Sequence, residues 1–195
     1  MMAALLHGGR LDDAIARFGG SREDWLDLST GINPVPYPVP QLPQDSWSKL
    51  PDAEAEQALL EAARRYYQVP DHMEIVAANG TQSLIERLPQ VLGADAVCVV
   101  SPTYTEHAHV WGRSGANVSE ARAPSGDEAL VVIVNPNNPT AEITPLDRLQ
   151  SITAYGQTLI VDEAFVDPTP DVSLVPAQPQ NAVVLKSFGK FFGLA

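Results

Sequence analysis

Lys190 is the side chain of this sequence best suited to covalent chemistry, because a lysine amine can form a Schiff base with a carbonyl compound. It closes the segment Lys186-Ser187-Phe188-Gly189-Lys190, which directly follows the apolar run 182–185. A lone lysine at such a place is usually a solvated surface charge. Its role therefore depends on which other polar groups the fold brings to it.

Two adjacent carboxylates, Asp162 and Glu163, end the apolar run 159–161. An ionised group at the end of a buried strand needs a partner, because burial of an unpaired charge is costly. One such partner is a cationic ring nitrogen, which Asp162 would keep protonated so that the ring withdraws electrons from a developing carbanion. The alternatives are a metal ion or an ion pair with Arg or Lys. The sequence has no His or Cys cluster that matches a metal site.

Three further polar segments also follow apolar runs. Asn79-Gly80-Thr81 opens a helix, whose first N–H groups can bind a phosphate, although the same pattern also serves as an ordinary helix cap. Tyr104 could stack on a planar heterocycle or pack at a loop edge. Asn138 belongs to the rigid turn 135–140, which holds three amide side chains, more than a plain turn needs.

These groups together match the functional groups of one cofactor. Asn138 offers a hydrogen bond to a ring hydroxyl, Asp162 a carboxylate to a ring nitrogen, Ser187 a ligand to a phosphate, and Lys190 an amine. The sequence therefore predicts a site for pyridoxal 5′-phosphate (PLP).

The elements that must position these residues are short apolar runs that alternate with helical stretches. The runs are rich in Val and Ile and do not alternate with polar residues, which is typical of a parallel sheet covered by helices on both faces. In such α/β sheets ligands bind outside the carboxyl ends of the strands, where the polar residues lie. The expected strands are 74–78, 96–100, 117–121, 130–134, 158–161 and 182–185. The expected helices are 11–18, 53–67, 81–92, 106–113 and 146–155.

Composition narrows the class of partner. Twenty-four acidic and twelve basic residues give a net charge of −12, which disfavours nucleic acid and anionic membrane surfaces and favours a small-molecule substrate. No apolar stretch is long enough to span a bilayer. The single cysteine, Cys98, lies within an apolar run, which indicates a buried thiol and a reducing, cytoplasmic location.

The whole motif set resembles the fold-type I PLP-dependent enzymes of the aminotransferase class I/II superfamily, from about His7 to the last residue. The resemblance implies the large domain of a PLP-dependent transferase fold. It implies that Gly80, Thr81, Gln82 and Ser187 bind the cofactor phosphate, that Tyr104 stacks on the ring, that Asn138 bonds the 3′-oxygen, that Asp162 pairs with the ring nitrogen, and that Lys190 forms the Schiff base.

Within the superfamily, the leading segments are similar to the branch that decarboxylates L-threonine O-3-phosphate in cobalamin biosynthesis. His7-Gly8-Gly9, the segment 25–34 and the run 162–167 carry this similarity. It implies loss of the α-carboxylate as CO2 to give (R)-1-amino-2-propanol O-2-phosphate, with His7, Gly31 and Asn33 as substrate-binding candidates. A histidinol-phosphate-type aminotransferase and a non-catalytic binding module with the same fold remain alternatives.

The resemblance also implies how the chain is organised. Residues 1–50 are expected to form an N-terminal arm on the substrate side, and residues 51–195 an incomplete large domain that lacks the C-terminal small domain. We expect a homodimer at full length and little activity from the 195 residues alone. Ala141 and Leu50 depart from the family pattern, which usually has Gly and often Tyr at these positions.

Overall fold

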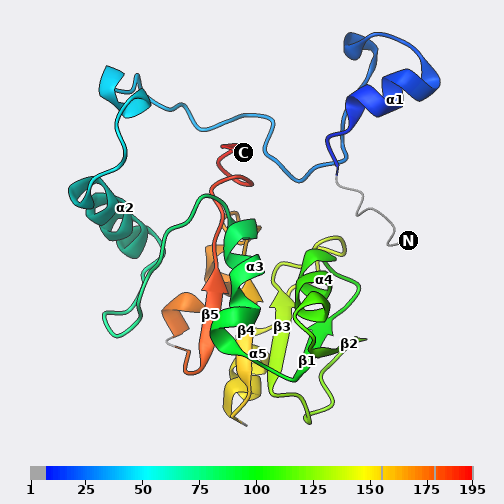
Figure 1. Cartoon of the computed structure of the whole chain (residues 1–195), viewed down its shortest axis with the longest axis vertical. Helices are drawn as coiled ribbons and strands as arrows, with labels where there is room; N and C mark the ends of the chain where they lie inside the picture. Colours follow the sequence, from blue (N-terminus) through cyan, green and yellow to red (C-terminus); the bar gives the residue numbers. More distant parts are fainter. Residues whose placement is uncertain (1–7, 155, 178, 195) are drawn as a thin grey trace.

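A five-stranded parallel sheet forms the centre of the chain in the computed structural model, which describes residues 8–154, 156–177 and 179–194 (Figure 1). The spatial order of the strands is β2-β1-β3-β4-β5, and every neighbouring pair is parallel. The carboxyl ends of the strands therefore share one edge, as the sequence pattern predicts. The strands are β1 (Ala96–Val100), β2 (Asn117–Ala121), β3 (Leu130–Val134), β4 (Thr158–Asp162) and β5 (Ala182–Leu185).

Burial explains why these runs are almost entirely apolar. All five residues of β3 are buried, as are the three central residues of β1 and the last four of β4. A strand that is covered on both faces has no solvent side on which polar residues would alternate. β2, at the edge of the sheet, is the exception and carries exposed polar residues.

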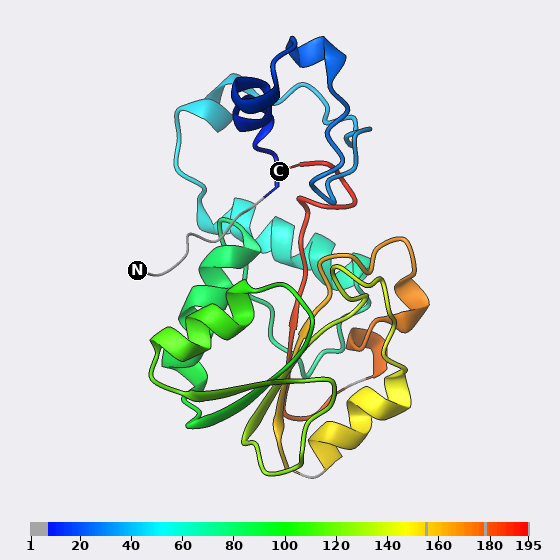
Figure 2. The same cartoon turned by 90° about the vertical axis from the view of Figure 1, so that its right-hand side faces the viewer.

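Helices cover both faces of the sheet, which confirms the predicted fold class (Figure 2). Helices α3 (Thr81–Leu92) and α4 (Glu106–Arg113) bury Ile85, Val110 and Trp111 against one face. Helix α5 (Leu146–Ala154) buries Leu149 and Ile152 against the other. Cys98 is buried in this second core cluster, as its apolar surroundings predict.

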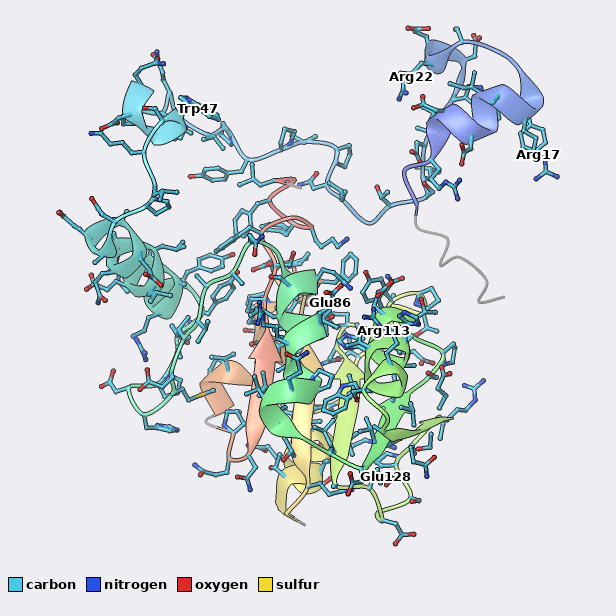
Figure 3. All side chains as sticks on the ribbon, in the orientation of Figure 1. Arg17, Arg22, Trp47, Glu86, Arg113 and Glu128 are labelled. Atoms are coloured by element: carbon cyan, nitrogen blue, oxygen red, sulfur yellow. The ribbon has the colours of Figure 1, made fainter. Side chains whose placement is uncertain are left out.

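The N-terminal arm lies outside the sheet core and carries helix α1 (Leu11–Phe18) and the short 3₁₀ turns η1 (Arg22–Asp24) and η2 (Gln44–Trp47). None of these elements has a buried residue, and the labelled side chains on them lie away from the sheet (Figure 3). The helix that follows, α2 (Ala53–Tyr66), begins at the N-cap Asp52, whose carboxylate accepts a hydrogen bond from the Ala55 N–H at 2.9 Å.

One predicted strand is wrong. Residues 74–78 form no strand in the described chain and belong to the connection between α2 and α3. Val76 is 74% exposed, so the apolar composition of this run does not reflect burial. Among the described residues no helix is both long and apolar enough to cross a membrane.

The two core clusters allow a direct test of where stability resides. Leu159, in the centre of β4, is fully buried in the cluster beneath α5, whereas Leu50 is 92% exposed. We expect Leu159→Ala to lower the free energy of unfolding by about 3 kcal/mol, because it removes buried methyl groups and leaves a cavity. Leu50→Ala should change it by less than about 0.5 kcal/mol. Urea unfolding followed by circular dichroism measures both, and equal losses would contradict the assignment of the core.

Candidate active site

A cavity of about 240 Å³ lies at the carboxyl ends of the strands. Its lining brings together residues from α3, from the loop after β1, from the turn after β3 and from the segments after β4 and β5. All eight residues to which the sequence assigned cofactor contacts are among them. The full lining is Gly80, Thr81, Gln82, Ile85, Tyr104, Val134, Asn138, Asp162, Ala164, Phe165, Ser187 and Lys190.

The N-terminus of α3 forms one side of the cavity. Gly80 is the N-cap and has a φ of 96°, a conformation that residues with a side chain rarely adopt. The first N–H groups of an α-helix have no acceptor within the helix and carry a partial positive charge. The Thr81 hydroxyl donates a hydrogen bond to the Lys186 carbonyl at 3.1 Å, which ties the helix to the segment that carries Ser187 and Lys190.

Asp162 presents a buried carboxylate whose two oxygens are both hydrogen-bonded. Oδ2 lies 2.9 Å from Nε2 of His107, and Oδ1 accepts the Ala164 N–H at 3.0 Å. Both side chains are almost fully buried, at 1% exposure for His107 and 5% for Asp162. These contacts hold the carboxylate in one orientation at the wall of the cavity.

Glu163, the neighbouring carboxylate, faces a different set of partners. It forms an ion pair with Lys186, its Oε2 accepts the Ser173 hydroxyl at 2.7 Å, and its Oε1 accepts the Leu174 N–H at 2.6 Å. Of the alternatives that the sequence left open for the two carboxylates, an ion pair with Lys applies to Glu163. The described residues contain no group of three or more His, Cys, Asp or Glu side chains that could hold a metal ion.

Tyr104 is linked to the helix side of the cavity through amide and carboxylate groups. Its hydroxyl donates to Gln82 Oε1 at 3.4 Å, and Gln82 Nε2 donates to Glu106 Oε2 at 3.0 Å. Burial raises the pKa of Tyr104, and the nearby charges of Glu106 and Asp162 raise it further. The phenol therefore stays neutral, and Tyr104 is part of the cavity lining.

The three asparagine side chains of the turn 135–140 have two different roles. Asn135 Oδ1 accepts the Thr144 N–H at 2.8 Å. Asn137 Nδ2 donates to the Pro102 carbonyl at 2.9 Å, and Asn137 Oδ1 accepts the Thr103 hydroxyl at 2.6 Å. Only the third amide, Asn138, lines the cavity. Two of the amides thus shape the turn that places the third.

The amine of Lys190 lies over the ring of Phe165, 5.6 Å from its centroid. The same ring is packed against Gly31 from the arm, where a Cβ would come within 2.5 Å of the Phe165 Cε1 atom. Asn33 also reaches this region, because its backbone N–H donates to the Lys190 carbonyl at 2.9 Å. Gly31 and Asn33 therefore lie beside residues 186–194, which we call the lysine segment. His7 lies outside the described residues.

Sequence reasoning missed His107 and Glu106, which both support the cavity. A signal was present, since His107 shares the buried face of α4 with Val110 and Trp111 at the spacing of one helical turn. That pattern would have identified a buried histidine but not its partner, because Asp162 lies 55 residues further along the chain.

The pair of Glu163 and Lys186 gives a test of stability. Glu163→Gln removes the ion-pair partner of the partly buried Lys186 ammonium, so we expect it to lower the free energy of unfolding by about 3 kcal/mol. The double variant with Lys186→Met should recover most of this loss, because the ammonium that lost its partner is then absent. Chemical denaturation of the wild type, of Glu163→Gln and of the double variant measures the free energy of unfolding of each. A double variant no more stable than Glu163→Gln would contradict the assignment.

Asp167 gives a pH-dependent prediction. It is only 9% exposed, and its Oδ2 has no hydrogen-bond partner among the described residues. Burial raises the pKa of Asp167, an effect that the nearby Lys186 charge partly opposes. A raised folded-state pKa means that the wild type loses stability as the pH rises from the unfolded-state pKa through the folded-state pKa.

We therefore expect Asp167→Asn to be more stable than the wild type at pH 7.5 and equal to it near pH 3, where the carboxyl is protonated in both states. Thermal unfolding across this range measures the difference. Asp171→Asn, at an exposed position, is the matched control and should show no such trend. A stability gain from Asp167→Asn that is the same at both pH values would rule out this explanation.

Comparison with known proteins places this geometry in a family. Residues 23–195 match the family described as aminotransferase class I and II. The threonine-phosphate decarboxylases of Sinorhizobium sp. and Pseudomonas aeruginosa are 42% and 40% identical to the chain and align with 100% and 98% of it. A histidinol-phosphate aminotransferase of Desulfitobacterium hafniense is 29% identical over 88% of the chain. The chain spans 61%, 59% and 55% of the length of these relatives.

Solved structures show the same fold. The histidinol-phosphate aminotransferase of Clostridium acetobutylicum superposes with a TM-score of 0.68 at 22% identity, over 85% of this chain and 56% of its own. That of Sinorhizobium meliloti, in complex with pyridoxal-5′-phosphate, has a TM-score of 0.64 at 20% identity, over 77% of this chain and 46% of its own. The matched family is PLP-dependent, which confirms the cofactor predicted from the sequence. The chain belongs to the aminotransferase class I and II family.

Proposed function

We propose that the complete gene product is a PLP-dependent decarboxylase of L-threonine O-3-phosphate that forms (R)-1-amino-2-propanol O-2-phosphate for cobalamin biosynthesis. The observation that carries this proposal is the similarity to two threonine-phosphate decarboxylases along essentially the whole chain, including the arm that lies beside Lys190. The lining of the cavity supports it, because its donor set fits the functional groups of PLP.

The residues that would hold PLP follow from the chemistry of the lining. Gly80, Thr81, Gln82 and Ser187 would bind the phosphate at the helix N-terminus, and Tyr104 would stack on the ring. Asn138 would bond the 3′-oxygen, Asp162 would pair with the ring nitrogen, and Lys190 would bind through its amine. When bound, PLP supplies the electron sink for the bonding pair left at the substrate α-carbon.

Asp162 is suited to this task because its environment keeps it in place. His107 and the Ala164 N–H fix both carboxylate oxygens, so the charge can face a cation in the cavity without reorganisation. Lys190 would move the proton, because its amine is the basic group in the cavity lining. It would donate a proton to the α-carbon after CO2 leaves.

The choice of bond depends on the orientation of the substrate. The bond that breaks is the one perpendicular to the cofactor ring, so a decarboxylase must hold the α-carboxylate in that position. His7 and Gly31 are the candidates within the chain for binding the α-carboxylate in this position. Phe165 presents an apolar ring rather than a hydroxyl on the same side, which leaves Asn138 as the proposed side-chain ligand of the 3′-oxygen.

We further propose a cytoplasmic homodimer that binds neither nucleic acid nor membrane. The net charge of −12 repels both phosphate backbones and anionic lipid surfaces. Large exposed apolar side chains along the arm favour its burial in an assembly. They include Leu26, Leu28, Trp47 and Leu50.

A histidinol-phosphate-type aminotransferase is the second candidate, favoured by the relative that is 29% identical. Both reactions use the same cofactor groups, so the reaction product distinguishes them. We expect the complete gene product to release one CO2 per L-threonine O-3-phosphate consumed and to form no 2-oxo acid. A 2-oxo acid without CO2 would refute the decarboxylase proposal.

Lys190→Ala should reduce this activity by about 10³-fold or more, because it removes the group that transfers the proton. It should also abolish the absorbance band of the cofactor bound to the lysine. Lys49→Ala, an exposed position on the arm, is the matched control and should retain both. An unchanged spectrum in Lys190→Ala would reject this lysine as the attachment site.

A further inference from the structure

The arm and the segment that carries Lys190 run beside each other as two hydrogen-bonded chains. The Asn33 N–H donates to the Lys190 carbonyl at 2.9 Å, and the Asn33 side-chain Nδ2 donates to the Phe191 carbonyl at 2.8 Å. Four residues further along the arm, the Tyr37 N–H donates to the Phe192 carbonyl at 2.7 Å. Three consecutive carbonyls of the lysine segment are thus bound by the arm.

The side chain of Asn33 is largely committed to these backbone contacts. Its Nδ2 serves the Phe191 carbonyl, and its Oδ1 accepts the Val35 N–H at 3.0 Å. A primary amide has two N–H donors and one carbonyl oxygen. One N–H and one lone pair remain for a substrate, so direct recognition is not the main use of this side chain.

The contact is also close. Gly193 has a φ of 63°, and a Cβ there would come within 2.7 Å of the Asn33 carbonyl oxygen and 2.9 Å of Pro36 Cα. The ring of Tyr37 meets the ring of Phe192 edge-on, with centroids 6.0 Å apart. The two segments therefore pack against each other in addition to sharing hydrogen bonds.

The same part of the arm restrains Lys190 from a second side. Gly31, two residues before Asn33, allows the Phe165 ring to approach the arm, and this ring lies under the Lys190 amine. The backbone of Lys190 and the neighbour of its side chain are thus both fixed by residues 31–33. A lysine side chain has four rotatable bonds, so the position of its amine depends on such anchors.

We propose that Asn33 is a positioning residue for Lys190, which holds the lysine segment through the Phe191 carbonyl rather than binding the substrate. This rests on the proposed role of Lys190 as the residue that binds the cofactor. Asn33 lies 158 positions before Phe191 in the chain. Their contact makes the geometry of the lysine depend on the order of the arm.

The test compares Asn33→Ala with Asn117→Ala, a matched change at an exposed residue of β2. Hydrogen exchange is measured first, in the cofactor-free complete gene product. The Gly193 and Leu194 amides donate to the Lys190 and Phe188 carbonyls, so they report on the lysine segment. We expect them to exchange about tenfold faster in Asn33→Ala, with exchange in β3 unchanged.

The second measurement is the rate at which the cofactor-free protein recovers its absorbance band after PLP is added. We expect Asn33→Ala to slow it about tenfold and to lower kcat by a similar factor, because small displacements of a reacting group have large effects on rate. KM should stay within twofold of the wild type. Gly193→Ala should disturb the same contact between the arm and the lysine segment. It should therefore reproduce the faster exchange and the slower recovery.

Two results would overturn the proposal. A rise in KM with unchanged exchange and recovery would make Asn33 a substrate ligand. Faster exchange throughout the sheet, with a lower melting temperature, would make it a general structural residue. The exchange and recovery measurements use no substrate. A wild type that binds PLP but releases no CO2 would therefore reject the decarboxylase function without deciding the role of Asn33.

Discussion

The hydrogen bond between Asp162 and His107 is the interaction on which the rest of the site depends, because it allows a carboxylate to end a buried strand. β4 is an interior strand between β3 and β5, and the backbone at Asp162 is held on both sides: its carbonyl accepts the Asn135 N–H, and the next N–H donates to the Leu185 carbonyl. Asp162 itself is only 4% exposed. A charge at this position therefore requires polar partners, and α4 supplies one from the face that it covers.

Strand geometry then separates the two adjacent carboxylates. Successive side chains of an extended chain point to opposite faces, so Asp162 meets the helix on one face while Glu163 meets Lys186 and Ser173 on the other. The two lysines after β5 are also separated, because β5 ends at Leu185 and the chain bends at residues 188–190. Lys186 is the partner of Glu163, and Lys190, four residues later, reaches the cavity. One carboxylate and one lysine thus stabilise the fold, and the other carboxylate and lysine face the cavity.

The sequence predicted the five strands, and the polar residues that follow β1, β3, β4 and β5, because both come from local patterns. Buried parallel strands must be apolar, and their ends must carry the polar groups that form the site. It could not predict the partner of Asp162 or of Glu163, since pairing across a sheet depends on strand order. It was wrong for residues 74–78, where an apolar run is exposed because no strand lies beside it in the described chain. Local composition shows a tendency toward strand, whereas pairing requires a neighbour.

The contacts of the arm also could not be predicted from local composition, and they involve the segment that carries Lys190. Its own elements have no buried residue, so its order cannot come from a core of its own, and its contacts with residues 190–193 provide an external restraint. The residues proposed to bind the cofactor line one cavity at the N-terminus of α3 and the carboxyl ends of the strands. The arm, by contrast, touches both the lysine segment and the Phe165 ring. If bond choice depends on how a substrate is oriented over a shared cofactor, the arm can influence that choice without altering a single cofactor ligand.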